Sequence, residues 1–123
     1  MLHDTARARC LALPAATEDQ PFGEGTLVFR VGGKIFALLA LDERPARLNL
    51  KCDPEEAADL RERYACVLPG YHMNKAHWNT VVLDGSVAPA EVGGWIEASY
   101  RLVRASLAKR VQAALDAAPE EEA

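Results

Sequence analysis

The chain has 123 residues, of which 50% are hydrophobic and 26% are charged, and its formal net charge is −4. This length fits one domain, and no apolar run approaches the ~20 residues that a membrane-spanning helix needs. A negative net charge excludes a strongly basic, non-specific nucleic-acid binder. Because Met1–Asp4 does not begin a basic region followed by an apolar region, we expect no secretory signal and a cytoplasmic location.

The first half of the sequence predicts a helix and then three strands. The helix covers about Asp4–Leu13 and ends before Pro14, because proline cannot continue a helix. A loop rich in Gly, Pro and acidic residues follows at residues 17–25. The strands are Thr26–Val31, Lys34–Leu41 and Arg47–Cys52. Gly32 and Gly33 allow the positive φ angles of a tight hairpin between the first two strands. The middle strand is apolar on both faces, which predicts a central position in the sheet.

The second half predicts a helix, two further strands and a long helix. Asp53–Glu56 contains the capping residue, the proline and the glutamates that typically start a helix, and this helix reaches about Tyr64. The later elements are strands at Cys66–Leu68 and Trp78–Leu83 and a helix from Pro89 to about Ala114.

The order α-β(3)-α-β(2)-α indicates a two-layer α+β sandwich, in which helices cover one face of a five-stranded antiparallel sheet. We expect residues 1–115 to form this single domain and the acidic tail, residues 116–123, to be disordered. The alternation of the strands then predicts a polar row on the uncovered face: Arg30, Arg47, Asn49 and Lys51. Such a row is either an anion-binding surface or an ordinary solvated sheet face.

The segment Tyr71–Thr80 carries more polar and aromatic groups than a short connection needs, and such loops often contain binding sites. Lys51 and Lys75 are suited to contact phosphate, while His72 and Trp78 are suited to stack on bases. The candidate residues for binding a nucleic acid or another anion are Arg30, Arg47, Lys51, His72, Asn74, Lys75, His77 and Trp78.

Part of this segment also suits a purely structural role. Asn74 and Asn79 are able to read base edges, but Asn74 equally suits holding the loop through backbone hydrogen bonds. Trp78 is better suited to covering the core than to stacking, because a large aromatic side chain is usually mostly buried. Both roles are open for His77, whereas Lys75 is not needed to close the loop.

Several stretches of the sequence are similar to the MmcQ/YjbR family. They are Phe29–Ala37, Leu50–Glu55, Met73–Val81, Leu83–Ser86 and Ala98–Tyr100. They occur in the family's order, the resemblance covers about Ala6–Arg110, and the His-Trp run is fairly specific to it. The resemblance implies the α-β(3)-α-β(2)-α fold, a layout similar to that of type III secretion chaperones. It also implies DNA binding through a "double wing" motif.

The remaining reactive residues do not predict a catalytic, metal or cofactor site. His72 and His77 are five positions apart, which would place them on opposite faces of a strand, and no third zinc ligand accompanies them. The sequence has no nucleophile elbow, phosphate loop or paired-carboxylate motif. Cys10, Cys52 and Cys66 form no Cys-x-x-Cys pair, and we expect them to be buried free thiols.

The sequence therefore favours a non-enzymatic binding protein, with DNA or another polyanion as the leading partner. The alternative is a peptide- or protein-interaction module with a secretion-chaperone-like fold, since exposed strand edges can accept a further strand. A second alternative is a small-molecule-binding protein or an enzyme of unknown type. We expect no cofactor and no membrane partner, and the sequence leaves the oligomeric state open.

Overall fold

The computed structural model describes residues 1–70 and 73–117. Within these ranges the helices are α1 (His3–Leu11), α2 (Pro54–Arg63), α3 (Pro89–Ala105) and α4 (Lys109–Ala117). The strands are β1 (Thr17–Asp19), β2 (Thr26–Val31), β3 (Lys34–Ala40), β4 (Arg47–Lys51), β5 (Val67–Pro69) and β6 (Trp78–Val82). All neighbouring strands are antiparallel, in the order β1-β2-β3-β4-β6-β5.

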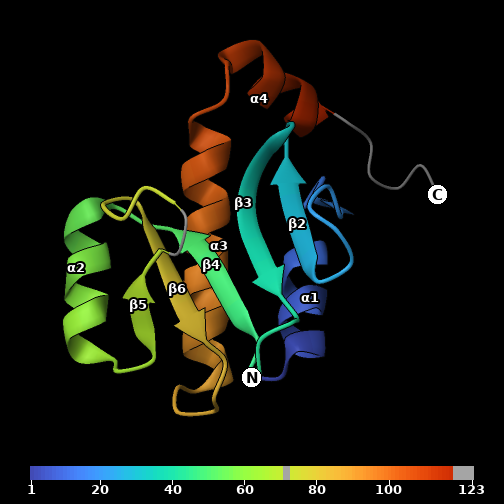
Figure 1. Cartoon of the computed structure of the whole chain (residues 1–123). Helices are drawn as coiled ribbons and strands as arrows, with labels where there is room; N and C mark the ends of the chain where they lie inside the picture. The colour runs from blue at the N-terminus through green and yellow to red at the C-terminus, as the bar shows by residue number, and fades with distance from the viewer. Residues whose placement is uncertain (71–72, 118–123) are drawn as a thin grey trace.

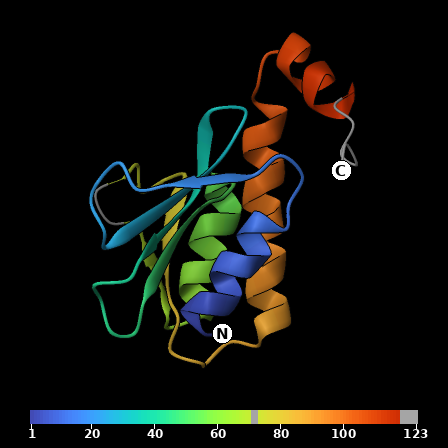
Figure 2. The same ribbon diagram turned by 90° about the vertical axis from the view of Figure 1, so that its right-hand side faces the viewer.

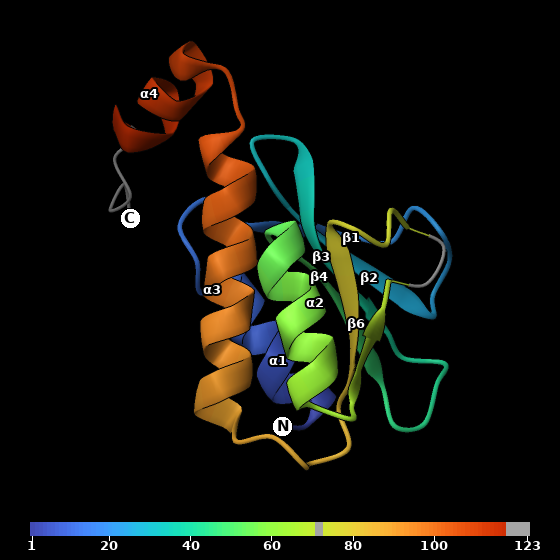
Figure 3. The same cartoon turned by 90° about the vertical axis from the view of Figure 1, so that its left-hand side faces the viewer.

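Helices α1, α2 and α3 pack against one face of the sheet and leave the other face open (Figures 1 and 3). Buried side chains between the two layers include Phe29, Phe36, Leu39, Leu48, Leu50, Ile96, Tyr100 and Val103. The Phe36 and Tyr100 rings meet edge to face, with centroids 5.3 Å apart. This arrangement confirms the predicted α+β sandwich and makes the open face the available surface of the sheet. No helix in the described ranges is long and apolar enough to cross a membrane.

A buried serine joins the longest helix to the two central strands. Ser99 on α3 donates a hydrogen bond from Oγ to the Phe36 carbonyl oxygen at 2.6 Å. The same Oγ accepts the Lys51 backbone N–H at 2.8 Å. A buried hydroxyl normally needs such partners, so Ser99 fixes the ends of β3 and β4 against α3.

The hairpin between β2 and β3 is formed as the sequence predicts. Gly32 and Gly33 have φ angles of 58° and 85°, in the left-handed region where glycine is favoured. A Cβ at Gly32 would lie 2.6 Å from the Leu107 side chain. The hairpin tip therefore packs against the segment that joins α3 to α4.

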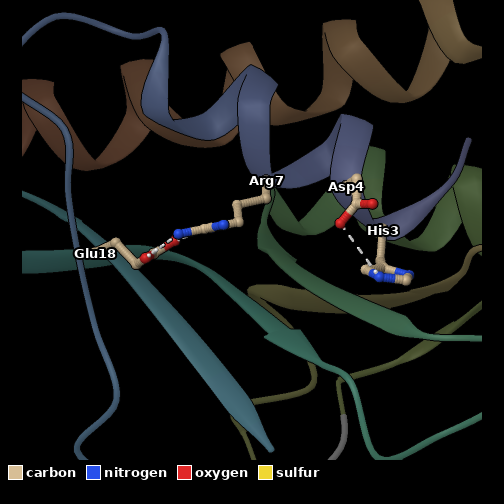
Figure 4. A network of polar contacts seen from close by, with 4 residues as sticks. All are labelled: His3, Asp4, Arg7 and Glu18. Atoms are coloured by element: carbon tan, nitrogen blue, oxygen red, sulfur yellow. Dashed lines mark hydrogen bonds and ion pairs between the residues drawn. The ribbon is translucent and has the colours of Figure 1, made fainter. Parts of the chain in front are cut away.

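The sheet has a sixth strand that the sequence does not reveal. Thr17–Asp19, expected to be loop, pairs with β2 as the edge strand β1. Arg7 on α1 holds this strand from the helix side: its Nε and Nη2 donate to the Glu18 carboxylate at 2.5 and 2.8 Å (Figure 4). Three polar residues are too few to show the period-two alternation of a strand. This segment is a strand because of its contacts with residues elsewhere in the chain, on β2 and α1.

The predicted helix over residues 89–114 is instead two helices, and α4 extends away from the body of the domain (Figures 1 and 2). At the break, the Ser106 hydroxyl donates to the Val103 carbonyl oxygen at 2.6 Å, and Gln112 Nε2 donates to that of Leu107 at 2.7 Å. Leu107 is buried at the hairpin tip, a contact distant in sequence. Residues 116 and 117 of the predicted tail belong to α4, and residues 118–123 lie outside the described residues.

Candidate functional site: the open face of the sheet

Strands β4 and β6 bring two of the candidate regions together. Along β4, buried leucines alternate with the half-buried residues Arg47, Asn49 and Lys51, as the sequence predicts. The antiparallel register sets Lys51 opposite Trp78 and Asn49 opposite Thr80. Directly opposed residues in a sheet point to the same face. Lys51 and Trp78 are therefore neighbours on the open face, where the Thr80 hydroxyl also donates to Asn49 Oδ1.

The arginines of this face lie apart from one another, and each faces a carboxylate. Arg30, on β2, has Nε 3.3 Å from Asp19 Oδ1 and donates from Nη1 to the Gly33 carbonyl oxygen at 3.3 Å. Arg47 Nε lies 3.8 Å from Glu43 Oε1, and this buried nitrogen has no hydrogen-bond partner among the described residues. Because acids offset both guanidinium groups, the open face is less cationic than its sequence predicts.

The turn that leads into β6 is built by its own backbone and by Asn74. Asn74 Oδ1 accepts the Ala76 N–H at 2.9 Å, and the Asn74 carbonyl oxygen accepts the N–H groups of His77 and Trp78 at 3.2 and 2.9 Å. Asn74 and His77 are exposed, and the His77 carbonyl oxygen accepts the Cys52 N–H at 2.8 Å. Asn74 therefore holds the loop through backbone hydrogen bonds, which is one of the two roles that its sequence position suggests.

Lys75 also makes a contact within this loop. Its Nζ donates to the Gly70 carbonyl oxygen, directly after β5, at 2.9 Å. Contrary to the expectation from the sequence, the Lys75 side chain therefore helps to close the loop. Gly70 in turn donates its N–H to the Trp78 carbonyl oxygen at 2.9 Å. A Cβ at Gly70 would lie 2.8 Å from Trp78 Cβ, which explains a glycine at this position. His72 lies outside the described residues.

Asn79 faces the helices rather than the open face. It is 3% exposed, and its Oδ1 accepts Nη1 of Arg61, on α2, at 2.7 Å. Its Nδ2 donates to the Ala57 carbonyl oxygen at 3.3 Å, while Arg61 Nη1 also donates to that of Lys75 at 3.2 Å. This network ties α2 to the turn, and it leaves Asn79 unavailable to read base edges on the open face.

A groove runs over the open face between the protruding loops. The loops 20–25 and 41–46 extend beyond the sheet on the side away from the helices (Figure 3). The groove has a volume of about 740 Å³ and is lined by Phe22, Thr26, Ile35, Leu38, Ala40, Asp42, Glu43, Arg47, Asn49, Met73 and Thr80. Its floor is mainly apolar, and Phe22 on the wall is 68% exposed. Pockets of this volume commonly hold ligands.

The sequence indicates only part of this groove. Arg47 is both a predicted site residue and a lining residue, whereas Lys51 and Trp78 lie on the same face outside the lining. The apolar floor and Phe22 were not among the candidates. The sequence does contain evidence for the apolar floor. Lys34–Leu41 is apolar on both faces of the strand, although helices cover only one face of the sheet. The sequence does not indicate that Phe22 lines the groove, since the position of Phe22 depends on how its loop folds over the sheet.

The described residues do not form a metal centre, and the half-buried thiol of Cys52 is not activated. They contain no group of three or more His, Cys, Asp or Glu side chains that could hold a metal ion. Cys10 and Cys66 are buried, Cys52 is half-buried, and all three are free. Burial, with a smaller effect of Glu56 and then Asp53, raises the pKa of the Cys52 thiol to about 11. A reactive cysteine instead needs a lowered pKa.

Comparisons with known proteins identify the family. The YjbR family model matches residues 11–102. The chain is 40% identical to the Escherichia coli O157:H7 protein YbdF over 90% of its own length and 91% of that protein. It is 37% identical to YjbR of Escherichia coli K12 over 75% of its own length and 78% of that protein.

Solved structures give the same result. The crystal structure of Deinococcus radiodurans protein DR2400, described as domain DUF419, aligns with a TM-score of 0.88 and 39% identity, over 94% of this chain and 88% of that one. A solution NMR structure of a Pseudomonas syringae protein aligns with a TM-score of 0.71 and 30% identity, over 84% and 93% of the two chains. The sequence and the fold agree, and this chain belongs to the YjbR family.

Proposed function

We propose that the protein is a binding module whose open sheet face holds an extended polypeptide segment. The observation that carries this proposal is the composition of the groove, in which apolar residues form the floor and charges of both signs lie at one end. An extended segment presents alternate side chains to one side, so apolar residues at every second position fit such a floor.

The charges on the open face favour a polypeptide over a polyanion. Arg30 faces Asp19, and Arg47 faces Glu43. A phosphate chain would have to displace or tolerate these carboxylates, and affinity for nucleic acid depends on the number of cations that reach phosphate. A polypeptide is not subject to this restriction, because it contributes apolar contact area to the floor.

Nucleic-acid binding is a second candidate because of one specific pair. Lys51 lies directly opposite Trp78 on the open face, so a phosphate contact and a stacking surface are adjacent. Single-stranded nucleic acids use this combination, and the family resemblance implies DNA binding. With few converging cations, such binding would be of modest affinity.

Titration with fluorescent peptides and oligonucleotides tests the two candidates. A peptide with alternating Leu should bind, and Leu38→Thr should weaken its binding about tenfold, because apolar contact area is lost from the floor. The matched control is Leu11→Thr, which makes the same change on α1, where Leu11 is exposed; this variant should bind normally. Failure of every apolar peptide to bind the folded protein would reject the proposal.

A salt series on the same samples distinguishes nucleic acid from peptide. Oligonucleotide affinity should fall linearly on a log–log plot as salt rises, with a slope that reflects a few phosphate contacts. It should fall further in Lys51→Ala and Trp78→Ala, and Leu38→Thr should leave it unchanged. Tight oligonucleotide binding together with absent peptide binding would establish the second candidate in place of the first.

A further inference from the structure

We infer that the polypeptide held in the groove is basic as well as apolar, with a Lys or Arg side chain at the Asp42–Glu43 end. This inference rests on the proposed peptide-binding function and names the class of segment that the groove selects. It follows from three features of the groove: the balance of its charged residues, the fixed position of one carboxylate and the spacing of its floor.

The charged residues that line the groove are two acids, Asp42 and Glu43, and one base, Arg47. The Arg47–Glu43 contact is long, at 3.8 Å, and Arg47 Nε makes no hydrogen bond with the described residues. This pair is therefore loosely held, and Glu43 is available to a second cation. Asp42 has no ion pair or side-chain hydrogen bond within residues 1–70 and 73–117. The groove lining thus carries an excess of negative charge, which a cationic ligand would neutralise.

The Asp42 carboxylate is positioned by the contact between two loops. The Leu41 N–H donates to the Gly25 carbonyl oxygen at 2.7 Å, which joins the 41–46 loop to the end of the 20–25 loop. A Cβ at Gly25 would overlap the Asp42 carboxylate, so this carboxylate packs directly on the glycine backbone. Asp42 is an exposed residue and can accept a ligand cation without a buried charge having to form.

The floor beside this acidic end has the spacing of an extended peptide. Ala40 on β3 pairs with Thr26 and Arg47, next to the acids, and Leu38 pairs with Asn49 two residues further along the strand. Same-face positions in an extended chain repeat every ~6.6 Å, in the sheet and in a bound peptide alike. A peptide lying along β3 would place its basic side chain at Asp42 and its next same-side residues, which are apolar, over Ala40 and Leu38. Beyond Leu38 the β2–β3 register shifts, and Ile35 lies three positions away rather than two.

Peptides with Leu at every second position, in which the first Leu of that row is replaced by Lys, Gln or Glu, test this inference by fluorescence anisotropy at low salt. The Lys peptide should bind most tightly and the Glu peptide least tightly. In the double variant Asp42→Asn/Glu43→Gln, the preference for the Lys peptide over the Gln peptide should fall about fivefold, the scale of one or two exposed ion pairs. Arg47→Gln should increase that preference, because it removes the competing cation.

A matched control separates local charge from net charge. Glu55→Gln/Glu62→Gln removes the same two negative charges from exposed positions of α2, on the helix side of the sheet, and should leave the preference unchanged. An equal loss in both double variants would mean attraction to the whole acidic protein and would overturn the inference.

The outcome also distinguishes the inference from the function on which it rests. If the Gln peptide binds and the Lys and Glu peptides bind equally well, the groove is a peptide site without charge selection, and only the inference fails. If none of the peptides binds, the proposed function fails. A circular dichroism melt of each variant establishes that it is folded. Should the double variant fail to fold, Glu43→Gln alone, at an exposed position, provides the same comparison.

Discussion

The two faces of β4 and β6 differ in chemistry, although alternate residues of the same two strands build both. On the helix side, Leu48 is buried, and the amide of Asn79 is bonded at both its oxygen and its nitrogen. On the open side, Lys51 and Trp78 are half-buried, and among the described residues the side chain of Arg47 is held by a 3.8 Å ion pair with Glu43. The comparison shows that the same two strands contribute to stability through one face and carry the proposed binding surface on the other.

The largest expected difference between the two faces is in the free energy of unfolding for substitutions in β3. Phe36 is fully buried against Tyr100, whereas Leu38 lies on the open floor of the groove. Phe36→Ala should cost about 3–5 kcal/mol, through lost burial and the cavity that it leaves. Leu38→Ala should cost about 1 kcal/mol. Urea unfolding measures both, and equal costs would mean that a partner or another segment covers the open face.

The two strand asparagines offer the same substitution on opposite faces. Asn79→Ala should cost about 1–3 kcal/mol, because Arg61 loses its acceptor in a partly buried position. It should also shift the NMR signals of residues 73–78, since Arg61 contacts the Lys75 carbonyl oxygen. Asn49→Ala removes a partner of Thr80 on the open face and should cost less. If Asn49→Ala proved as costly as Asn79→Ala, the open face would be as important for stability as the helix side.

The sequence predicts the parts of this contrast that depend on local alternation. Arg47, Asn49 and Lys51 face outward as their period of two requires. Gly32 and Gly33 form the hairpin as predicted. These features are predictable because the steric preferences of neighbouring residues determine them.

The features that the sequence does not predict depend on contacts between distant residues. The break after α3 involves Leu107 and the β2–β3 hairpin, and β1 depends on Arg7 for one of its contacts. The groove needs Phe22 and Asp42 from two loops that meet over the sheet. Asn79 faces the helices because it follows Trp78 in β6, and neighbouring residues of a strand point to opposite faces. Alignment of β6 with β4, which sets Trp78 opposite Lys51 and Asn79 opposite Leu50, would have predicted this direction.

Burial between the helices and the sheet also keeps the Cys10 thiol protonated at a pH at which an exposed thiol would ionise. Burial raises the pKa of the Cys10 thiol to about 12, while in the unfolded chain the thiol titrates near its ordinary value of ~8.5. Between these values the unfolded state loses a proton that the folded state keeps, so stability falls as pH rises. At about pH 10 the loss should be roughly 1–2 kcal/mol, and Cys10→Ala should remove that part of the alkaline slope. An unchanged slope in Cys10→Ala would assign it to other groups.

The smallest contrast is at β1, where two neighbouring acids pair on opposite faces. Glu18 accepts a bidentate contact from Arg7 on the helix side (Figure 4). Asp19 faces Arg30 on the open side. The hydrogen bond from Arg7, with a smaller Coulomb contribution, lowers the pKa of Glu18. A carboxylate with a lowered folded-state pKa stabilises the fold above its unfolded pKa, and this stabilisation is lost as pH falls through the folded-state value.

Glu18→Gln should therefore lower the melting temperature by about 2 °C at neutral pH, with the difference from the parent protein disappearing in acid. Asp19→Asn should have a smaller effect, because its contact to Arg30 is longer than that of Glu18 to Arg7 and the Asp19 side chain is more exposed than that of Glu18. Thermal melts over a pH series check both variants. A larger effect of Asp19→Asn would show that the open-face ion pair is the stronger of the two. Contacts important for stability would then extend onto the open face at its β1 edge, and Arg30 would be even less available to a phosphate group.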